Sequence, residues 1–483
     1  MDVIEVSKYN ETYNRIKCDP GIGYELSEYF TFDVPGAKFM PAVRNKFWDG
    51  KIRLYNVMSC LLYGGLNQYV EQFAKSRNYQ VIYTSDFSAD ELSLKEASDF
   101  IQSLNLPSKY KPRDYQIEAF THCIRNRRSL LLSPTASGKS FIIYLIVRYY
   151  NARTLIIVPT TSLVSQLASD FNDYGFVFDR YIHRIFAGQD KHTDKPITIT
   201  TWQSIYKMPK EYFKQFDVVV GDEAHLFKAK SLTSILTKLD NCKYRFGFTG
   251  TLDGTQTHKL VLEGLFGPVK QVTTTAELIE QKHLTQFEVK AIVLKHNEQI
   301  CKQLKGVDYQ AEVDYLVRSD SRNRFIKNLT LSLEGNTLLL FQFVDKHGKV
   351  LYDIISKETD RSVYYVHGGV DGEDREEIRR ILEQKQDAIV IASSGTFSTG
   401  VNIPSLRNII FGSPSKSKIR TLQSIGRVLR KSDGKDGAIL YDIADDLTWK
   451  QKKNYTIQHF VERIKIYNEE QFNYKIYPVN LKE

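Results

Sequence analysis

One short stretch, residues 130–140 with the sequence LLLSPTASGKS, limits the possible folds of this chain more than any other. Three leucines lead into a loop of small residues, and the apolar run FIIYLI follows at residues 141–146. This order predicts a buried strand, a tight loop and a buried helix whose N-terminus faces the loop. The stretch fits the phosphate-loop pattern G-x-x-x-x-G-K-[ST], except that Ser133 replaces the first glycine. The alternative is an ordinary strand–turn–helix with an exposed lysine.

The phosphate-loop interpretation assigns roles to its side chains. Lys139 is placed to reach the β- and γ-phosphates of ATP, and Ser140 is placed to ligate the Mg²⁺ that bridges them. Thr135, Ser137 and Gly138 belong to the loop whose backbone N–H groups would cradle the phosphates. The sequence therefore predicts ATP and Mg²⁺ as cofactors.

Composition and charge are those of a soluble globular protein with several domains. At 483 residues, 42% of them hydrophobic and 25% charged, the chain has room for three domains of roughly 100–200 residues each. No apolar run approaches the roughly 18 residues of a membrane span, and the first residues lack a signal-peptide pattern, so we expect a cytoplasmic protein. The five cysteines lack C-x-x-C spacing, which argues against disulfides and a zinc site. The net charge of +9 favours a polyanionic partner without requiring one.

Strands and helices alternate from Tyr110 to about Gln286, which predicts a parallel, doubly wound α/β sheet. Short β-branched runs at residues 155–159, 197–200 and 218–220 are typical of strands that are buried on both faces. Each of these runs ends in polar residues. In a parallel sheet such residues meet at the carboxyl edge, where α/β proteins bind their ligands.

An acidic pair follows the third run. Asp222 and Glu223 come directly after Gly221, at the predicted carboxyl end of a central strand. Asp222 would hold Mg²⁺ through water, and Glu223 would orient or deprotonate the attacking water. An isolated Asp-Glu pair is usually only a helix cap. A pair that follows a phosphate loop in the same alternating pattern favours the catalytic interpretation.

These motifs occur in the order typical of one family. The phosphate loop, the D-E-A-H spelling of residues 222–225 and the T-G-T at residues 249–251 resemble motifs of the superfamily 2 nucleic-acid helicases, in which two RecA-like domains close on ATP. The resemblance implies that Arg113 and Gln116 belong to the segment that reads the adenine, and that the T-G-T segment couples hydrolysis to movement. It also implies strand-gripping residues, which are Thr160, Thr201, Trp202 and, in the second unit, Thr396.

A second alternating unit begins near Phe287 and has no phosphate loop of its own. Buried strands are predicted at residues 337–341, 363–368 and 387–392. The segments after the third strand resemble the helicase motifs at the domain interface. The resemblance implies that Gly400 contacts the nucleotide and that three further residues act in catalysis, namely Gln423, Arg427 and Arg430.

The arginine pair of this second unit has a physical role in that scheme. Arg427 and Arg430 are three positions apart, so both could face one side of a helix and point across the cleft. A guanidinium supplied by the second domain stabilises charge on the γ-phosphate only when the cleft is shut, which ties hydrolysis to domain motion. The alternative, surface ion pairs, does not account for the ordered motifs around them.

The first 105 residues are expected to form a small α+β accessory domain. Strands are predicted at residues 9–18 and 80–84 and a helix at residues 23–30, with a hairpin that turns at Asp49-Gly50. Cations interleave with aromatic residues on this hairpin, which makes it a candidate DNA-binding surface. Its residues are Arg44, Lys46, Trp48, Lys51 and Arg53. An equal alternative is a solvated edge strand with an aromatic face on the core.

The chain ends in a basic, aromatic segment, residues 449–483, with a helix-like run through Tyr467. Such a segment can follow a phosphate backbone while its rings stack on bases. It can also be an amphipathic helix that packs one face onto the second motor domain, which we favour. That face would consist of Ile457, Phe460, Val461 and Ile464.

The predicted architecture is α/β, with two tandem RecA-like parallel-sheet motor domains at residues 106–286 and 287–448 after the N-terminal α+β domain. Residues 47–54 and 415–419 further resemble phage helicases that migrate DNA branches. This implies a phage enzyme of the host cytoplasm that uses ATP to unwind and branch-migrate forks, Holliday junctions or R-loops in replication, recombination or repair. The alternative is a translocase that tracks duplex DNA without separating strands. We expect a monomer whose partner is branched, forked or single-stranded DNA.

Overall fold

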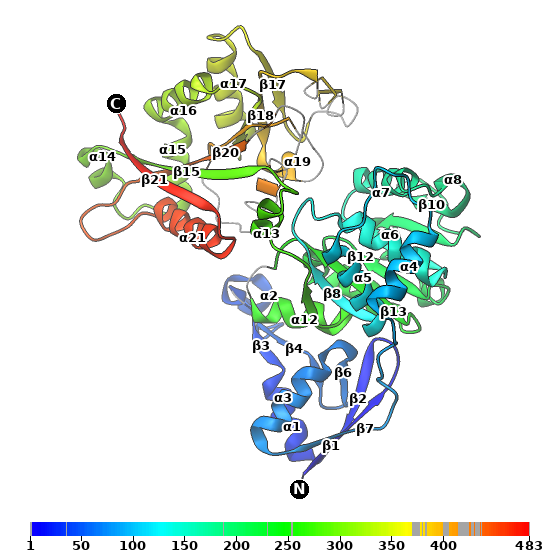
Figure 1. Ribbon diagram of the computed structural model, residues 1–483. Coiled ribbons are helices and arrows are strands. Elements are labelled where there is room, and N and C mark those ends of the chain that lie inside the picture. The colour runs from blue at the N-terminus through cyan, green and yellow to red at the C-terminus, as the bar shows by residue number, and fades with distance from the viewer. Residues whose placement is uncertain are drawn as a thin grey trace. The chain divides into compact units, whose positions relative to one another are not determined.

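A computed structural model describes most of the chain, and it divides into two compact units that we treat separately (Figure 1). The first unit comprises residues 1–133 and 138–272, and the second comprises residues 134–137 and 273–483. The described residues are 2–34, 36–186, 188–228, 230–252, 255–369, 377–378, 380–381, 384–398, 405–413, 425–426, 429, 435 and 437–482.

The N-terminal part of the first unit is a small mixed sheet with flanking helices. Its strand order is β5-β6-β2-β1-β7, in which β1 pairs parallel with β7 and antiparallel with β2. The elements are β1 (Val3–Lys8), β2 (Tyr13–Lys17), α1 (Pro20–Tyr29), β5 (Tyr55–Asn56), β6 (Leu61–Tyr63), η2 (Gly64–Leu66), α3 (Asn67–Arg77) and β7 (Gln80–Tyr83). Ile4 and Val6 of β1 are fully buried, as expected for a strand with one face on a core. The predicted α+β fold of this part is confirmed.

The predicted hairpin at Asp49-Gly50 is wrong. β4 (Lys51–Arg53) does follow this turn, but its antiparallel partner is β3 (Thr31–Asp33). Residues between these strands form η1 (Ala37–Phe39) and α2 (Pro41–Arg44). Pro41 stands in the first turn of α2, where its missing N–H leaves no hydrogen bond unmade and its fixed φ favours a helical start. The cations of this region therefore lie on a short helical excursion and on β4, not on a two-stranded ribbon.

The motor part of the first unit is built on a parallel sheet. Among the described residues, seven strands follow the order β10-β11-β9-β12-β13-β8-β14, and all their pairings are parallel. They are β8 (Arg128–Leu132), β9 (Thr154–Val158), β10 (Ile182–Ile185), β11 (Ile197–Thr201), β12 (Val218–Gly221), β13 (Tyr244–Thr249) and β14 (Val269–Gln271). β12, which precedes the acidic pair, is central, as predicted. The sequence patterns miss β13 because Arg245 interrupts its apolar run.

Helices cover both faces of this sheet. One core lies under α4 (Leu94–Ser103), α5 (Asp114–Asn126), α6 (Lys139–Tyr150) and α7 (Thr161–Asp173). The other lies under α9 (Trp202–Ile205), α10 (Lys210–Phe213), α11 (Lys230–Lys238) and α12 (Gln256–Phe266). Ala97 and Ile101 of α4 pack with Phe120 in the first core, so α4 belongs to the motor part. The boundary predicted at residue 105 therefore falls one helix too late.

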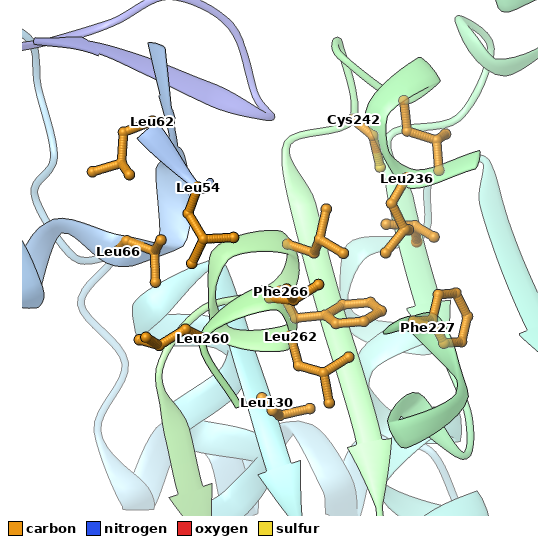
Figure 2. Close-up of a cluster of buried hydrophobic side chains, with 14 of the residues drawn as sticks. Leu54, Leu62, Leu66, Leu130, Phe227, Leu236, Cys242, Leu260, Leu262 and Phe266 are labelled. Atoms are coloured by element: carbon orange, nitrogen blue, oxygen red, sulfur yellow. The ribbon is translucent and has the colours of Figure 1, made fainter. Parts of the chain in front are cut away.

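The second of these cores continues into the N-terminal sheet. Leu54 and Leu66 from the N-terminal part belong to the same buried cluster as Leu260 and Leu262 of α12 (Figure 2). This cluster extends further to Phe227, which follows the acidic pair. The N-terminal domain thus shares a core with the motor part and packs directly onto it.

The second unit repeats the parallel architecture. Its seven described strands follow the order β17-β18-β16-β19-β20-β15-β21, and all their pairings are parallel. They are β15 (Gln286–Lys295), β16 (Thr337–Phe341), β17 (Ser362–Val366), β18 (Ala388–Ser393), β19 (Asn408–Phe411), β20 (Gly437–Asp446) and β21 (Asn473–Asn480). Helices of this unit include α15 (Tyr309–Arg318), α16 (Asp320–Ser332), α17 (Lys349–Ser356), α19 (Ser394–Ser398) and α21 (Tyr455–Glu469). The three strands predicted here are confirmed as β16, β17 and β18.

The C-terminal segment is part of this second sheet. Ile457, Phe460 and Ile464 of α21 pack in a small core with residues of β15 and β20, whereas Val461 is 41% exposed. The packing interpretation therefore holds for three of the four predicted residues. β21 then pairs with β15 over eight residues, a strand that the sequence analysis does not predict. In the described part of the chain no helix combines the length and the apolar character needed to cross a membrane.

Candidate active site

The predicted phosphate loop connects β8 to α6. Ala136 and Gly138 both have positive φ values, 67° and 83°, which turn the chain sharply into the helix. The Ser137 hydroxyl donates to the Pro134 carbonyl oxygen at 2.7 Å and closes the turn. The N-cap of α6 is Gly138, which offers no side chain to the first N–H groups of the helix. Those N–H groups are the ones that a phosphate would accept from.

Gln116 lies directly against this turn. Its Oε1 accepts a hydrogen bond from the Arg113 backbone N–H at 3.1 Å, which fixes the side chain at the start of α5. A Cβ at residue 138 would meet the Gln116 amide, and the φ of 83° favours glycine there. Arg113 donates from Nη1 to the Tyr115 hydroxyl at 2.7 Å. Of the two residues that the family resemblance assigns to adenine, Gln116 lies against the loop, and Arg113 is joined to Gln116 at the start of α5.

The acidic pair lies at the carboxyl end of β12, next to the loop lysine. Lys139 Nζ is 3.6 Å from Glu223 Oε1. Burial raises the pKa of the Asp222 carboxyl to about 6, while the nearby Lys139 opposes this rise and Glu223 adds to it. Glu223 has a φ of 49°, a conformation that costs energy for a residue with a side chain and that is common at functional sites. The structure therefore brings together the three residues predicted for catalysis in the first unit.

Ser140 has a partner that the sequence analysis did not name. Its Oγ lies 2.9 Å from the hydroxyl of Tyr174, just after α7. Tyr174 is buried, and burial raises the pKa of its hydroxyl. A metal ion on Ser140 would therefore share this oxygen with the tyrosine. No spacing in the sequence links residues 140 and 174, so only the fold could reveal the contact.

The D-E-A-H and T-G-T segments are in direct contact. His225 Nδ1 lies 3.4 Å from Glu223 Oε2 and 3.0 Å from Thr249 Oγ1. Thr249 in turn donates from Oγ1 to the Thr251 carbonyl oxygen at 2.8 Å. A chain of polar contacts thus connects the predicted water-orienting carboxylate to the end of β13.

The predicted strand-gripping residues of the first unit meet at one sheet edge. β9 and β11 are neighbours, with Val158 opposite Thr201, so the loops after them lie side by side. Thr160 caps α7 by accepting from the Leu163 N–H at 3.4 Å. Trp202 packs partly against the core and contacts the Tyr206 ring at 5.7 Å between centroids. The tryptophan thus has a packing role, whichever ligand the loops bind.

The N-terminal cations divide into two groups. Arg53 forms a 2.5 Å ion pair with Asp49, and Lys51 lies 4.0 Å from Asp33. Arg44 and Lys46 are exposed, and no ion pair is found for them among the described residues. These two are therefore the more available to an anion.

The aromatic residues of this region divide in the same way. Trp48 is held by a hydrogen bond from Nε1 to the Lys51 carbonyl oxygen at 2.9 Å. Phe47, by contrast, is 86% exposed, and Phe39 is 67% exposed. The sequence makes both Trp48 and Phe47 candidates for stacking on a base, and their exposure favours Phe47.

Three segments of the chain match described protein families. Residues 3–84 match the family described as DNA helicase UvsW, N-terminal. Residues 109–254 match the type III restriction enzyme res subunit, and residues 321–432 match the helicase conserved C-terminal domain.

One relative covers the whole chain. The ATP-dependent DNA helicase uvsW of Enterobacteria phage T4 is 35% identical over 503 residues, which span 99% of this chain and 100% of the relative. The chain belongs to the UvsW helicase family. The crystal structure of T4 UvsW, 34% identical, covers 100% of both chains with a TM-score of 0.53. The DNA 3'-5' translocase XPB2 of Sulfurisphaera tokodaii is 25% identical over 383 residues, 72% of this chain and 85% of that relative.

In the second unit of this UvsW-family chain, the structure describes only one of the predicted site residues. Thr396 lies on α19, is buried, and accepts a hydrogen bond from Ser393 Oγ at 2.7 Å. The other predicted residues, Gly400, Gln423, Arg427 and Arg430, lie outside the described residues. Their roles stay predictions.

Proposed function

We propose that this chain is an ATP-dependent DNA helicase that unwinds and branch-migrates branched DNA. The observation that carries the ATPase part is the meeting of Lys139, Asp222 and Glu223 at the carboxyl edge of a parallel sheet. A loop lysine for the phosphates beside two carboxylates for metal and water is the arrangement that nucleotide hydrolysis requires.

Mg²⁺ suits the residues of this site. Ser140 and Asp222 offer oxygen ligands, which Mg²⁺ prefers. Asp222 is buried with a raised pKa, so a cation would compensate its charge. Bound Mg²⁺ supplies neutralisation of the β- and γ-phosphate charge. In this proposal Glu223 orients the attacking water, and Lys139 holds the phosphates.

The second unit completes this site in the proposal. Arg427 and Arg430 would stabilise charge on the γ-phosphate, with Gln423 beside them and Gly400 against the nucleotide. Thr396 would join Thr160, Thr201 and Trp202 in gripping a DNA strand. The family membership supports these assignments.

Two observations support DNA as the substrate, namely the named activity of the T4 relative and the exposed cations of the N-terminal part. The T4 relative is named an ATP-dependent DNA helicase, and it matches the chain from end to end. Arg44, Lys46 and Phe47 offer two exposed cations and an exposed ring in the N-terminal part, a combination that suits phosphates and unstacked bases. We assign junction binding to this surface. The cytoplasmic location and the monomeric state expected from the sequence stay predictions.

A second candidate function is duplex translocation without strand separation. The XPB2 relative, which is named a DNA 3'-5' translocase, favours it over the part of the chain that it covers. Both functions require the same ATPase site, so the site alone does not separate them.

The deciding experiment compares ATPase rates with single-stranded, duplex, forked and four-way DNA, together with strand displacement and triplex displacement on the same substrates. The helicase proposal expects the largest stimulation with forked and four-way DNA, and it expects strand displacement. Stimulation by plain duplex with triplex displacement but no strand separation would favour the translocase. Glu223→Gln serves as the control, since it should bind Mg-ATP but hydrolyse it about 10²–10⁴-fold more slowly.

A further inference from the structure

Helix α12 contacts both the D-E-A-H loop and the N-terminal part of the first unit. The helix follows the T-G-T segment and contributes Leu260, Leu262 and Phe266 to the buried cluster (Figure 2). No helicase motif named above includes its residues. It nevertheless has specific polar contacts near each of its ends.

The first end of α12 holds the D-E-A-H loop. His258 is 4% exposed, and its Nε2 donates to the backbone carbonyl oxygen of His225 at 2.9 Å. Because a carbonyl can only accept, this contact requires the tautomer that carries its proton on Nε2. The side chain of the same His225 lies 3.4 Å from Glu223, so His258 fixes the backbone from which that contact is made.

Close packing strengthens this attachment. The Phe266 ring meets the Phe227 ring edge-on, with centroids 5.3 Å apart. A Cβ on Gly221, the residue before Asp222, would lie only 2.7 Å from the Phe266 ring. Because glycine has no Cβ at residue 221, α12 can approach the strand end that carries the predicted catalytic carboxylates.

The other end of α12 holds the N-terminal part. Glu263 is 2% exposed, and its Oε2 accepts from the Tyr69 hydroxyl of α3 at 2.5 Å. Its Oε1 accepts from the Val269 N–H at 3.0 Å, so both carboxylate oxygens are occupied. A Cβ at residue 65 would overlap the Glu263 carbonyl oxygen, so the two backbones touch at Gly65.

We propose that α12 is a coupling helix that transmits the binding of DNA at the N-terminal part to the position of Glu223. His258 is a positioning residue that acts through His225, and Tyr69–Glu263 is the contact through which the N-terminal part moves the helix. The residues involved, His258 and Glu263, are only five positions apart on one helix, so a shift at one end displaces the other. This inference rests on the proposed DNA-stimulated ATPase.

The test at the N-terminal end is Tyr69→Phe, which removes one hydroxyl and keeps the ring. The matched control is Tyr83→Phe, because the Tyr83 hydroxyl donates to Glu71 at 2.6 Å, a bond that lies wholly within the N-terminal part. In the full-length protein with saturating forked DNA, Tyr69→Phe should lower the DNA stimulation of kcat about fivefold or more. Its basal kcat and its KM for ATP should be unchanged, and Tyr83→Phe should behave as the parent.

The test at the catalytic end compares two substitutions of one residue. His258→Leu removes the donor. With saturating forked DNA, it should lower kcat about fivefold or more, and so lower the DNA stimulation, without changing the KM for ATP. His258→Gln keeps an N–H donor near the position of Nε2 and should restore most of the loss. A purely structural role would instead lower the midpoint of thermal unfolding equally in both variants, with no rescue of kcat by glutamine.

The two ends should also depend on each other. If the helix couples them, the double variant Tyr69→Phe/His258→Leu should lose no more DNA stimulation than the worse single variant. Additive losses, or equal stimulation of Tyr69→Phe, Tyr83→Phe and the parent, would overturn the inference while leaving the proposed function intact. Absence of DNA stimulation in the parent would overturn the proposed function, and the inference with it.

Discussion

Lys139, Asp222 and Glu223 lie close together because of strand order. β8 and β12 are separated in the sheet by β13, and the residues that follow each strand emerge at the same edge. A lysine and an adjacent pair of carboxylates, more than 80 residues apart in the sequence, thereby form one charged site. Neighbouring side chains then orient the groups of this site. Tyr174 contacts the Ser140 hydroxyl, and His225 contacts the Glu223 carboxylate.

Lys139→Ala should abolish ATP turnover and leave DNA binding largely unchanged. The ammonium group is placed for phosphates of the nucleotide, not of the DNA. ATPase rates and fluorescence anisotropy with labelled forked DNA would measure the two activities. Lys214→Ala, which breaks an exposed pair with Glu211, is the control and should affect neither. Equal loss of hydrolysis and DNA affinity in Lys139→Ala would contradict the assignment.

His347 should make the second unit sensitive to mild acid. Burial, assisted by Arg322, lowers the pKa of His347 from 6.5 to about 3, with Asp445 acting in the opposite direction. As the pH falls below 6.5, the unfolded chain takes up a proton that the folded chain refuses, so the folded state loses stability down to about pH 3. The loss between pH 7.5 and pH 5 should be about 2 kcal/mol.

Urea unfolding of the full-length protein at these two pH values would measure this loss. His347→Asn keeps a polar group for the contact with Ser413 Oγ, 3.0 Å from Nδ1, and the parent should lose about 2 kcal/mol more stability over this pH range than the variant does. Asp445, whose pKa is lowered to about 2, contributes only at lower pH and does not confuse the result. An unchanged pH dependence in the variant would place the sensitivity elsewhere.

At the scale of elements, local propensity decides where some helices begin, and pairing with a neighbour decides whether some segments become strands. α2 begins at Pro41 and includes Arg44, which the sequence predicts on a hairpin, because proline favours a helix start over a place in a ladder. β21, by contrast, contains Pro478 and is mostly exposed, and it is a strand because β15 offers it a free edge. Elements with strong apolar periodicity were predicted well. Elements such as β21, which are strands only because a neighbouring strand pairs with them, were not predicted.

The exposed cations of the N-terminal part should dominate the salt dependence of DNA binding. Replacing Arg44 and Lys46 by alanine should reduce the slope of log affinity against log salt by about two, since each phosphate contact contributes about 0.9. Replacing Lys51 and Arg53 should have less effect, because both lie near carboxylates. Binding titrations from low to high salt would measure the slopes, and equal slopes for the two double variants would contradict the distinction.

Phe47→Ala should weaken binding to forked DNA by about 1–3 kcal/mol with little change in that slope, because a ring contributes by stacking and not by charge. Tyr24→Ala is a suitable control, since Tyr24 is another exposed ring of the N-terminal part, at 66% exposure. An effect of equal size in both variants would remove the stacking role from Phe47.

At the scale of the whole molecule, the N-terminal part and the motor part of the first unit form one compact body. The cluster that buries Leu54 and Leu66 also buries Phe227, four residues after Glu223. A chain that binds DNA on one part of such a unit and hydrolyses ATP on the other needs no linker between them. The coupling proposed for α12 is a consequence of this shared core.

Removal of residues 1–84 should therefore destabilise the motor part. The deletion would expose leucines such as Leu260 and Leu262, and each fully buried leucine contributes roughly 1.5–3 kcal/mol. Thermal unfolding should show a lower midpoint, or the truncated protein should aggregate. A truncated protein with the midpoint and basal ATPase of the parent would show that the shared core is not required.

The sequence by itself determined the chemistry and the class of fold. Motif order predicted the helicase family, and apolar periodicity predicted the parallel sheets, because both are local signals that survive without knowledge of contacts. The tertiary structure decided what depends on contacts between distant residues. Those features are the Tyr174 hydroxyl on Ser140, the extent of the N-terminal domain, the strand β21 and the two attachments of α12. Each is a pairing across the fold, and neither spacing nor composition carries information about such pairings.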